Sequence, residues 1–253
     1  MTYIYEEVHI ESTMDKTLQP SLFFKAKGEK RPLLVGLHTW SHDRYNQIKN
    51  MLPYAQKYDF HLLLPDFRGA NLVKNIRAKE ACASELAKQD ILDAIAYVKE
   101  NYSIDESNIF LIGASGGGHM ALMMAAVQPL LFKAIAAFVP ITDLSKWVYE
   151  NKNYREHVLY CCGNDEYEMR RRSPIYFVDE IAKANLKIFH GKFDPVVPVT
   201  HSINLYNSII SKFPNSRTFF EIFDGGHQMD MEAAMRWINS QYINNLVLEN
   251  VTG

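Results

Sequence analysis

Short runs of apolar residues recur along the chain and predict the strands of its core. The runs are rich in Val, Ile, Leu and Phe and lack the apolar–polar alternation of half-exposed strands. Continuous runs of this length are expected for a parallel sheet that helices cover on both faces. The predicted strands are residues 33–37, 60–64, 109–112, 134–139, 186–189 and 218–223.

Segments with helical spacing of apolar residues lie between these runs. Ile91, Ile95 and Val98, for example, fall on one face of a helix, as expected where a helix packs against a sheet. Strand and helix therefore alternate along the chain, which is typical of α/β proteins. The predicted helices are residues 45–58, 84–101, 117–127, 199–212 and 229–245.

The first part of the chain differs, because two β-like segments, residues 3–11 and 21–26, follow each other with only a turn-like stretch between them. This order predicts an antiparallel hairpin at the edge of the sheet. Together the segments predict a doubly wound, mostly parallel sheet of about eight strands. Ligands of such sheets bind beyond the carboxyl ends of the strands, so functional residues are expected there.

One long segment, residues 141–184, interrupts the alternation between the sixth and seventh predicted strands. It is polar and aromatic, and we expect it to form short helices over the site as a small cap. No linker-like composition separates it from the rest, and the sequence shows no internal repeat or low-complexity tract. Residues 1–253 are therefore expected to form a single domain with the cap inserted in it.

Composition and charge argue against two classes of function, nucleic-acid binding and membrane binding. The chain is 47% hydrophobic and has 27 Lys and Arg against 29 Asp and Glu, so it offers no strong field to attract nucleic acid or an anionic membrane. No apolar run approaches the roughly 18 to 20 residues that span a bilayer. The N-terminus lacks a basic segment followed by an apolar one. We expect a cytoplasmic protein that binds neither nucleic acid nor membrane.

The three cysteines are odd in number and include a vicinal pair, Cys161 and Cys162, besides Cys82. This is not the pattern of a secreted disulfide framework, so reduced thiols are expected. The vicinal pair is an alternative metal site. No Cys-x-x-Cys or His-x-x-x-His spacing lies beside this pair in the sequence, and we favour structural or pocket-lining thiols.

A β-like run ending at Ile112 enters the sequence Gly113-Ala114-Ser115-Gly116-Gly117 and leaves into a helix-like segment. G-x-S-x-G between strand and helix is typical of a nucleophile elbow, where the tight turn admits only small residues beside the serine. The helix N-terminus adds partial positive charge that favours an oxyanion. The alternative is a glycine-rich loop that turns the chain or holds a phosphate, but neither a P-loop nor a dinucleotide fingerprint is present.

A serine nucleophile needs a base that accepts its proton and a carboxylate that orients the base. Asp194 follows the predicted strand 186–189, and His227 lies between the last predicted strand and the final helix. The order serine, acid, histidine at successive strand ends is that of α/β-hydrolases. We therefore predict the catalytic triad Ser115, Asp194 and His227. The competing carboxylates are Asp165, Asp179 and Asp224.

Backbone N–H groups are expected to hold the oxyanion. One is that of Gly116, after the nucleophile, and the other is that of Trp40, in the loop after the third predicted strand. His38, His42 and Asp43 lie in or beside this loop and form an alternative metal set. We favour supporting or surface roles for them, because serine chemistry needs no metal. No metal and no cofactor are expected.

These motifs resemble the α/β-hydrolase superfamily, and within it the prolyl oligopeptidase-like (S9-type) hydrolases and their small single-domain esterase relatives. The resemblance extends from about Leu33 to Trp237 and implies an α/β-hydrolase fold with its serine triad. The Asp-x-Arg-Gly and Arg-Ser-Pro elements look like the peptidase-like branch, whereas the loop after the third strand is similar to that of carbohydrate and feruloyl esterases. The motifs are residues 38–40, 65–69, 113–117, 172–174, 190–194, 197–198 and 226–227.

The chain departs from the prolyl oligopeptidases because 253 residues leave no room for their propeller domain. We therefore expect a serine carboxylic-ester hydrolase acting on small acyl or acetyl esters, such as those of carbohydrates or aromatic acids. The rivals are an oligopeptide hydrolase, a thioesterase or dienelactone-type hydrolase, and a non-catalytic relative that only binds ligands. Expected substrate contacts are His38, Trp147 and Tyr160, although the cap aromatics, which include Tyr149 and Tyr154, equally suit packing of the cap itself.

Overall fold

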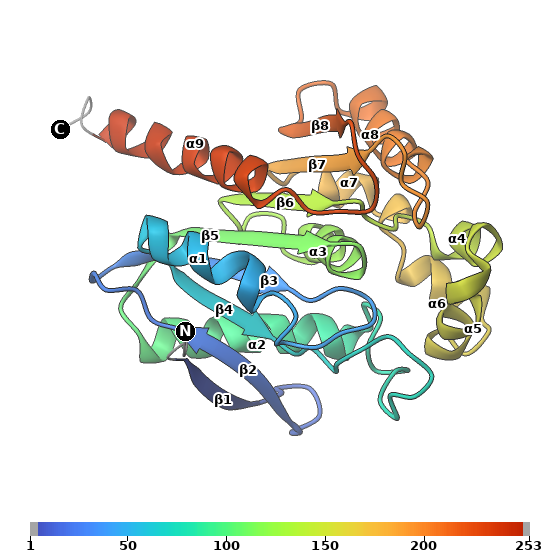
Figure 1. Cartoon of the computed structure of the whole chain (residues 1–253), viewed down its shortest axis with the longest axis horizontal. Coiled ribbons are helices and arrows are strands. Elements are labelled where there is room, and N and C mark those ends of the chain that lie inside the picture. The colour runs from blue at the N-terminus through green and yellow to red at the C-terminus, as the bar shows by residue number, and fades with distance from the viewer. Residues whose placement is uncertain (1–4, 250–253) are drawn as a thin grey trace.

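One sheet runs through the centre of the molecule (Figure 1). The computed structural model describes residues 5–249, and their side chains as far as Tyr242. Within that range, eight strands join in the order β1-β2-β4-β3-β5-β6-β7-β8. They are β1 (Glu6–Glu11), β2 (Leu18–Phe24), β3 (Arg31–Leu37), β4 (His61–Pro65), β5 (Ile104–Ala114), β6 (Ala134–Phe138), β7 (Leu186–Gly191) and β8 (Thr218–Phe223).

The first two strands form the predicted edge hairpin. They pair antiparallel, with Glu6 opposite Phe23 and Glu11 opposite Leu18; residues 3 and 4 of the predicted first strand lie outside the described residues. β2 also pairs antiparallel with β4, and all other neighbours in the sheet pair parallel. The prediction of an α/β fold with an eight-stranded, mostly parallel sheet is confirmed.

Helices cover both faces of the sheet (Figure 1). α1 and α9 share one apolar cluster with the sheet, and α2, α3, α7 and α8 share another on the opposite face. α3 is apolar all round, and its residues 116–126 are all buried, so it runs through the middle of the core. The helices are α1 (Ile48–Tyr58), α2 (Glu85–Asn101), α3 (Gly116–Val127), α7 (Val178–Ile181), α8 (Thr200–Lys212) and α9 (Met231–Glu249). None of the helices within residues 5–249 is both long and apolar enough to cross a bilayer.

The segment between β6 and β7 folds into short helices. In Figure 1, α4, α5 and α6 lie beyond the carboxyl ends of the parallel strands. Asp143, Asn151 and Asp165 are their N-cap residues, and the side chain of each accepts a hydrogen bond from a backbone N–H of the first turn. Such caps typically contribute about 1 kcal/mol, which helps helices this short to form. The elements are α4 (Leu144–Glu150), α5 (Lys152–Cys161), α6 (Glu166–Arg171) and the 3-10 helix η1 (Pro174–Tyr176).

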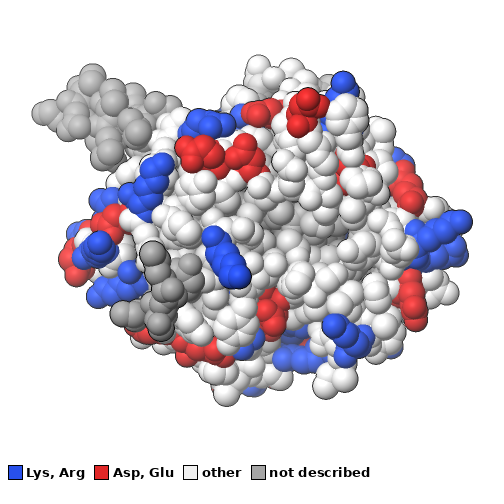
Figure 2. Space-filling model, viewed as in Figure 1, with Lys and Arg blue, Asp and Glu red and all other residues white. Residues whose placement is uncertain are grey.

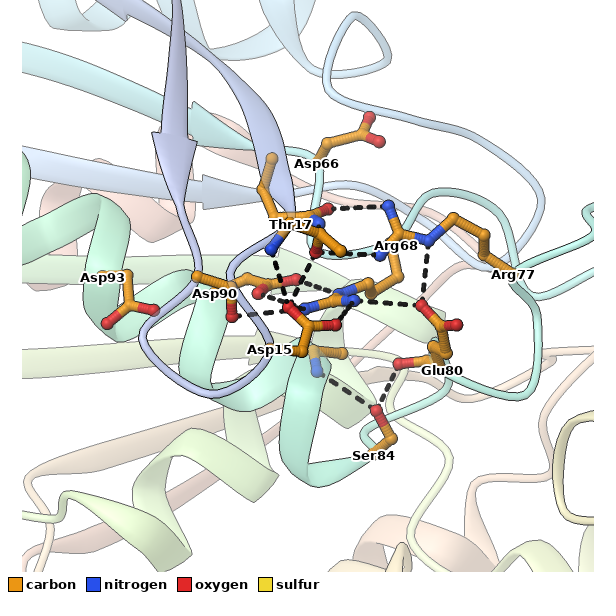
Figure 3. Close-up of polar contacts among 12 residues, drawn as sticks. Asp15, Thr17, Asp66, Arg68, Arg77, Glu80, Ser84, Asp90 and Asp93 are labelled. Carbon is orange, nitrogen blue, oxygen red and sulfur yellow. Dashed lines mark hydrogen bonds and ion pairs between the residues drawn. The ribbon is translucent and has the colours of Figure 1, made fainter.

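Arg68, in the loop after β4, is the centre of a buried ion cluster (Figure 3). Its Nε and Nη2 donate to the two oxygens of Asp90 on α2, at 2.6 and 2.9 Å. The same guanidinium donates to Asp15, in the turn between β1 and β2, at 2.7 and 3.1 Å, and to Glu80 at 3.0 Å. The cluster therefore joins the edge hairpin to α2 and to the loop after β4.

The backbone around Arg68 is left-handed at three consecutive residues, with φ of 31° at Phe67, 77° at Arg68 and 75° at Gly69. Such angles are costly for residues with side chains. The ion cluster holds one side of this loop. On the other side the Phe67 ring stacks on His38, with 3.8 Å between ring centroids. Because His38 directly follows β3, the strained loop also supports the segment that leads to Trp40.

Replacing Arg68 by Met is expected to lower the free energy of unfolding by about 3–5 kcal/mol, because Asp90 is left buried without its counter-ion. Urea unfolding measures the change. Arg170→Met is the matched control: Arg170 is exposed and pairs with Glu166 across one turn of α6, and such surface pairs contribute little. Equal losses in the two variants would show that the cluster stabilises no more than a surface pair.

Candidate active site

Ser115 occupies a tight turn between β5 and α3. Its φ of 57° lies in the left-handed region, which is strained for serine. Its N–H donates to the carbonyl oxygen of Phe138 at 2.9 Å, and its own carbonyl accepts from the N–H of His119 at 2.8 Å. These bonds hold the turn so that the serine stands at the N-terminus of α3.

Glycines allow the strand and the helix to approach at this turn. A Cβ on Gly113 would collide with the carbonyl group of Gly117, and a Cβ on Gly117 would lie 2.6 Å from the carbonyl oxygen of Leu37. No side chain fits at either outer position of G-x-S-x-G. The spacing of the motif is therefore a steric requirement of the turn.

Asp194 and His227 lie on the loops that follow β7 and β8. His227 Nδ1 is 2.8 Å from Asp194 Oδ2, which leaves Nε2 as the nitrogen that can accept a proton from the serine. Ser115 and His227 line the same cavity. No hydrogen bond joins these two described side chains, so proton transfer requires a closer approach, as is common in unliganded sites. The structure brings the three predicted residues together.

The Asp194 carboxylate is buried and receives several hydrogen bonds. Oδ1 accepts from the backbone N–H groups of Val196 and Val197 at 2.8 and 2.9 Å, and His190 Nε2 lies 3.4 Å from Oδ2. Burial by itself raises the pKa of Asp194, but the hydrogen bonds from His190, His227 and Val197 outweigh it and hold the pKa well below its ordinary value. The carboxylate is therefore ionised at neutral pH.

The competing carboxylates lie elsewhere. Asp165 is the N-cap residue of α6, Asp179 forms an exposed ion pair with Lys212, and Asp224 is exposed to solvent. Among the described residues, none of the three forms a hydrogen bond to His227. Asp194 is thus the carboxylate that the structure places beside the base.

The backbones of Trp40 and Gly116 meet beside Ser115. A Cβ on Gly116 would lie 2.5 Å from Trp40 N, so the two segments touch. Within the described part of the chain, neither N–H is taken by another protein acceptor. Two unoccupied donors next to the nucleophile are the arrangement that stabilises an oxyanion.

Asn46 supports this loop, and no sequence motif indicated it. Its Oδ1 accepts from Thr39 N–H at 3.1 Å and from Gln47 Nε2 at 3.0 Å. The carbonyl of Trp40 accepts from Asn71 N–H at 2.8 Å. The peptide units on either side of the Trp40 N–H are therefore both held in place. The contact arises because the chain folds back before α1, and no spacing rule would have revealed it.

A cavity of about 310 Å³ opens at Ser115. Its wall comes from the loop after β3, the start of α1, the end of β5, the loop after β8, and Tyr154 of the cap helix α5. Among the described residues that line it, none is Asp, Glu, Lys or Arg. Figure 2 shows that the hollowed centre of this side of the molecule is mainly uncharged, whereas charged side chains gather towards the outline.

The three residues predicted to contact substrate lie outside the cavity wall. His38 is buried, and both of its ring nitrogens lie against backbone carbonyl oxygens. Trp147 is 1% exposed and packs against Tyr154. Tyr160 borders a separate surface hollow. Of the four cap aromatics named from the sequence, Tyr154 is the one that the structure places in the described wall.

The three cysteines share a buried apolar cluster with Trp147. All are free thiols. A hydrogen bond with Cys82 and burial raise the pKa of Cys162 far above its ordinary value, so this thiol stays protonated. Within residues 5–249, no three His, Cys, Asp or Glu side chains gather in an arrangement that would hold a metal ion.

Comparison with known proteins identifies the family. A sequence model of the prolyl oligopeptidase family matches residues 41–244, which is most of the chain. The chain belongs to this family. A relative, acylamino-acid-releasing enzyme 1 of Oryza sativa subsp. japonica, is 26% identical over 192 residues, which is 68% of the chain and 24% of the rice enzyme. Inactive dipeptidyl peptidase 10 of Mus musculus is 24% identical over 144 residues, which is 57% of the chain and 17% of the mouse protein. The chain thus spans about a quarter or less of these two relatives.

Solved structures of the same fold include both long and short proteins. An acylaminoacyl peptidase of Pyrococcus horikoshii has a TM-score of 0.74 at 20% identity, covering 90% of this chain and 38% of that one. An esterase of Pyrococcus furiosus has a TM-score of 0.69 at 16% identity, covering 94% and 88%. An S-formylglutathione hydrolase of Staphylococcus aureus has a TM-score of 0.67 at 17% identity, covering 95% and 99%. At these identities the likeness shows the α/β-hydrolase fold alone.

In this prolyl oligopeptidase family member, Gly116→Ala is expected to lower kcat for ester hydrolysis about 10²- to 10³-fold, because the new methyl group presses on Trp40 N and displaces an oxyanion donor. Steady-state kinetics with p-nitrophenyl acetate measures this. The matched control is Gly163→Ala, at a position with φ of 67° and no neighbouring atom within 4 Å of the added Cβ. It strains the backbone away from the cavity and should retain kcat. Equal kcat in the two variants would contradict the assigned oxyanion site.

The stability that Asp194 contributes should depend on pH. Because its folded-state pKa lies below the unfolded value of about 3.9, the stabilisation is present above that value and is lost as the pH falls towards the folded-state pKa. The difference in unfolding free energy between wild type and Asp194→Asn should be smaller at about pH 3 than at about pH 5, because the wild-type carboxylate becomes protonated over this range. Urea unfolding over this range measures it, with the surface variant Asp179→Asn as control. A difference that persists undiminished at pH 3 would contradict the lowered pKa.

Proposed function

We propose that the chain is a serine carboxylic-ester hydrolase that acts on small acyl or acetyl esters, such as those of carbohydrates or aromatic acids. The observation that carries the proposal is the meeting of Ser115, His227 and the buried Asp194 at a small cavity. The two unoccupied backbone donors of Trp40 and Gly116 support it. All steps use groups of the protein, the ester and water.

The reaction proceeds through an acyl-enzyme. Ser115 Oγ attacks the ester carbonyl carbon while its proton passes to His227 Nε2, and the N–H groups of Trp40 and Gly116 hold the oxygen as it gains negative charge. The tetrahedral intermediate then expels the alcohol, which takes the proton from His227. In the second step His227 removes a proton from water, which attacks the acyl carbonyl. The acid leaves, and Ser115 regains its proton.

The cavity favours a compact, uncharged substrate. A volume of about 310 Å³ is at the small end for ligand sites. Amide and hydroxyl side chains, such as those of Asn50, Gln228 and Ser41, offer hydrogen bonds to sugar hydroxyl groups or carbonyl oxygens. Tyr154 offers a ring face to a sugar or an aromatic acyl group. A substrate with a free ammonium group would meet no carboxylate among the described lining residues, which favours an ester.

Peptide hydrolysis is the second candidate, because the chain belongs to the prolyl oligopeptidase family and one relative is named for releasing acylamino acids. An acylated amino acid has no terminal ammonium group, so an uncharged wall also suits it. The same triad would cleave the amide. A ligand-binding role without catalysis has one observation in its favour, the relative described as inactive, and the complete triad argues against it.

A cytoplasmic location is part of the proposal. It is supported by the three cysteines, which are all free and buried in the structure. Reduced thiols are expected where glutathione and thioredoxin maintain a reducing environment.

Ser115→Ala tests the proposed chemistry. We expect kcat for p-nitrophenyl acetate to fall about 10⁶-fold, because the acyl-enzyme can no longer form, and labelling by a fluorophosphonate to disappear. The matched control is Ser145→Ala, which removes a hydroxyl that has no hydrogen-bond partner among the described residues and lies outside the cavity wall. Turnover retained by Ser115→Ala would contradict the assignment of Ser115 as the nucleophile.

A substrate panel separates the two hydrolase candidates. Acetyl esters of alcohols and of sugars, acylamino-acid amides and aminoacyl-proline amides are compared by kcat/KM on wild-type protein. The proposal expects the acetyl esters to be the preferred group and a lengthening acyl chain to raise KM, because the cavity is small. Preferred cleavage of either amide class would reverse the ranking.

A further inference from the structure

The carbonyl oxygen of Val196 receives two hydrogen bonds from the cap. Trp147 Nε1, on α4, donates to it at 3.0 Å. Asn151 Nδ2, between α4 and α5, donates to it at 2.9 Å. Val196 belongs to the loop after β7 and lies two residues beyond Asp194. The cap is therefore hydrogen-bonded to the loop that carries the catalytic carboxylate.

The other side of the same residue is bonded to that carboxylate. The N–H groups of Val196 and Val197 donate to Asp194 Oδ1, while Asp194 Oδ2 is paired with His227 Nδ1. Contacts thus run from the cap through the backbone of Val196 to Asp194 and on to His227. A movement of Val196 would move the carboxylate that orients the base.

Trp147 is placed to act on this loop and not on a substrate. Its side chain is 1% exposed and does not belong to the cavity wall. Its ring stacks on Tyr154 at 5.0 Å between centroids and meets the ring of Trp40 edge-on, also at 5.0 Å. Tyr154 lines the cavity and Trp40 carries an oxyanion donor. One buried indole therefore touches the acid loop, the oxyanion loop and the cavity wall.

Asn151 is the single residue between α4 and α5. Its N–H donates to the carbonyl of Trp147 at 2.9 Å and ends α4. Its Oδ1 accepts from Asn153 N–H at 3.1 Å and begins α5. The side-chain oxygen thus serves the helix, and the side-chain nitrogen serves Val196. A serine at this position would keep a capping oxygen and lose the donor to Val196.

We propose that Trp147 and Asn151 are positioning residues of the catalytic triad, which hold the Val196 carbonyl and thereby keep Asp194 aligned with His227. This inference rests on the proposed function of the triad. In this proposal the cap contributes to catalysis by aligning the triad, in addition to its contribution to the cavity wall.

The two hydrogen bonds from Trp147 and Asn151 to the Val196 carbonyl form a clamp on this loop. Two conservative variants test the clamp. Trp147→Phe keeps an aromatic ring and removes the N–H, and Asn151→Ser keeps the helix cap and removes the amide donor. Each should lower kcat per titrated active site about 3- to 10-fold, the range expected for one hydrogen bond, with KM unchanged. Inactivation by a small fluorophosphonate should slow by the same factor, because it needs an activated Ser115 but no bound substrate.

The double variant should lose more than the product of the two single losses, because in each single variant the remaining donor still holds the carbonyl. Two matched controls should keep the kcat of wild type. Trp237→Phe makes the same ring change on α9, where Nε1 has no partner among the described residues. Asn153→Ser makes the same amide change at an exposed position of α5. If Trp147→Phe does not fold, Asn151→Ser decides alone.

Amide hydrogen exchange tests the clamp without any substrate. The N–H groups of Val196 and Val197 should exchange faster in Trp147→Phe and Asn151→Ser than in wild type, because their loop opens more often. Wild-type protein with neither ester hydrolysis nor phosphonate labelling would overturn the proposed function, while exchange would still test the clamp. Unchanged kcat and exchange, or a raised KM with unchanged kcat, would overturn the positioning role.

Discussion

The tight turn that joins β5 to α3 at Ser115 is the constraint on which the rest of the site depends. The sheet register sets Gly113 beside Leu37 of β3 and Ala114 beside Phe138 of β6, so the serine emerges where the loops after β3, β7 and β8 converge. Any side chain at Gly113 would push α3 away from the strand. The left-handed backbone at Ser115 is stable only because both packed elements hold it, and this ties the position of the nucleophile to the core of the sheet.

The same core explains how much of the fold the sequence predicts. Strands buried on both faces are continuous apolar runs, so β8 is predicted at its observed bounds, Thr218–Phe223, and β6 and β7 differ from their predicted ends by one or two residues. β5 is longer than predicted and begins at Ile104, because its first part is polar and partly exposed. α1 begins at Ile48, after a turn. Backbone pairing and turn geometry set these ends, and hydrophobicity does not report them.

The residues of the site also divide into those that the sequence predicts and those that it does not. Ser115, Asp194, His227 and Trp40 follow strands whose ends the topology brings together, so chain order and residue type suffice to choose them. The cap aromatics are different, because which of them faces the cavity depends on how α4 and α5 turn and pack. Trp147 is buried and Tyr154 is in the wall, although both are aromatic residues of one polar segment. Hydrogen bonds between a side chain and a backbone group elsewhere in the chain follow no spacing rule, as with Asn46 Oδ1 and Thr39 N–H or Asn151 Nδ2 and the Val196 carbonyl.

The cap contacts both the cavity and the loop that carries Asp194. Tyr154 contributes to the surface that a substrate meets, and Trp147, stacked directly behind it, contributes to the hold on Val196. A substrate that presses on Tyr154 also presses on Trp147, because closely packed rings transmit displacement and have little room to absorb it. Under the proposed ester hydrolysis, a compact acyl group would leave this stack in place and Asp194 aligned. A bulkier group that fitted only by shifting Tyr154 would disturb the same stack, so the proposed function and the proposed positioning role together link the size of the substrate to the rate of its cleavage through this pair of rings.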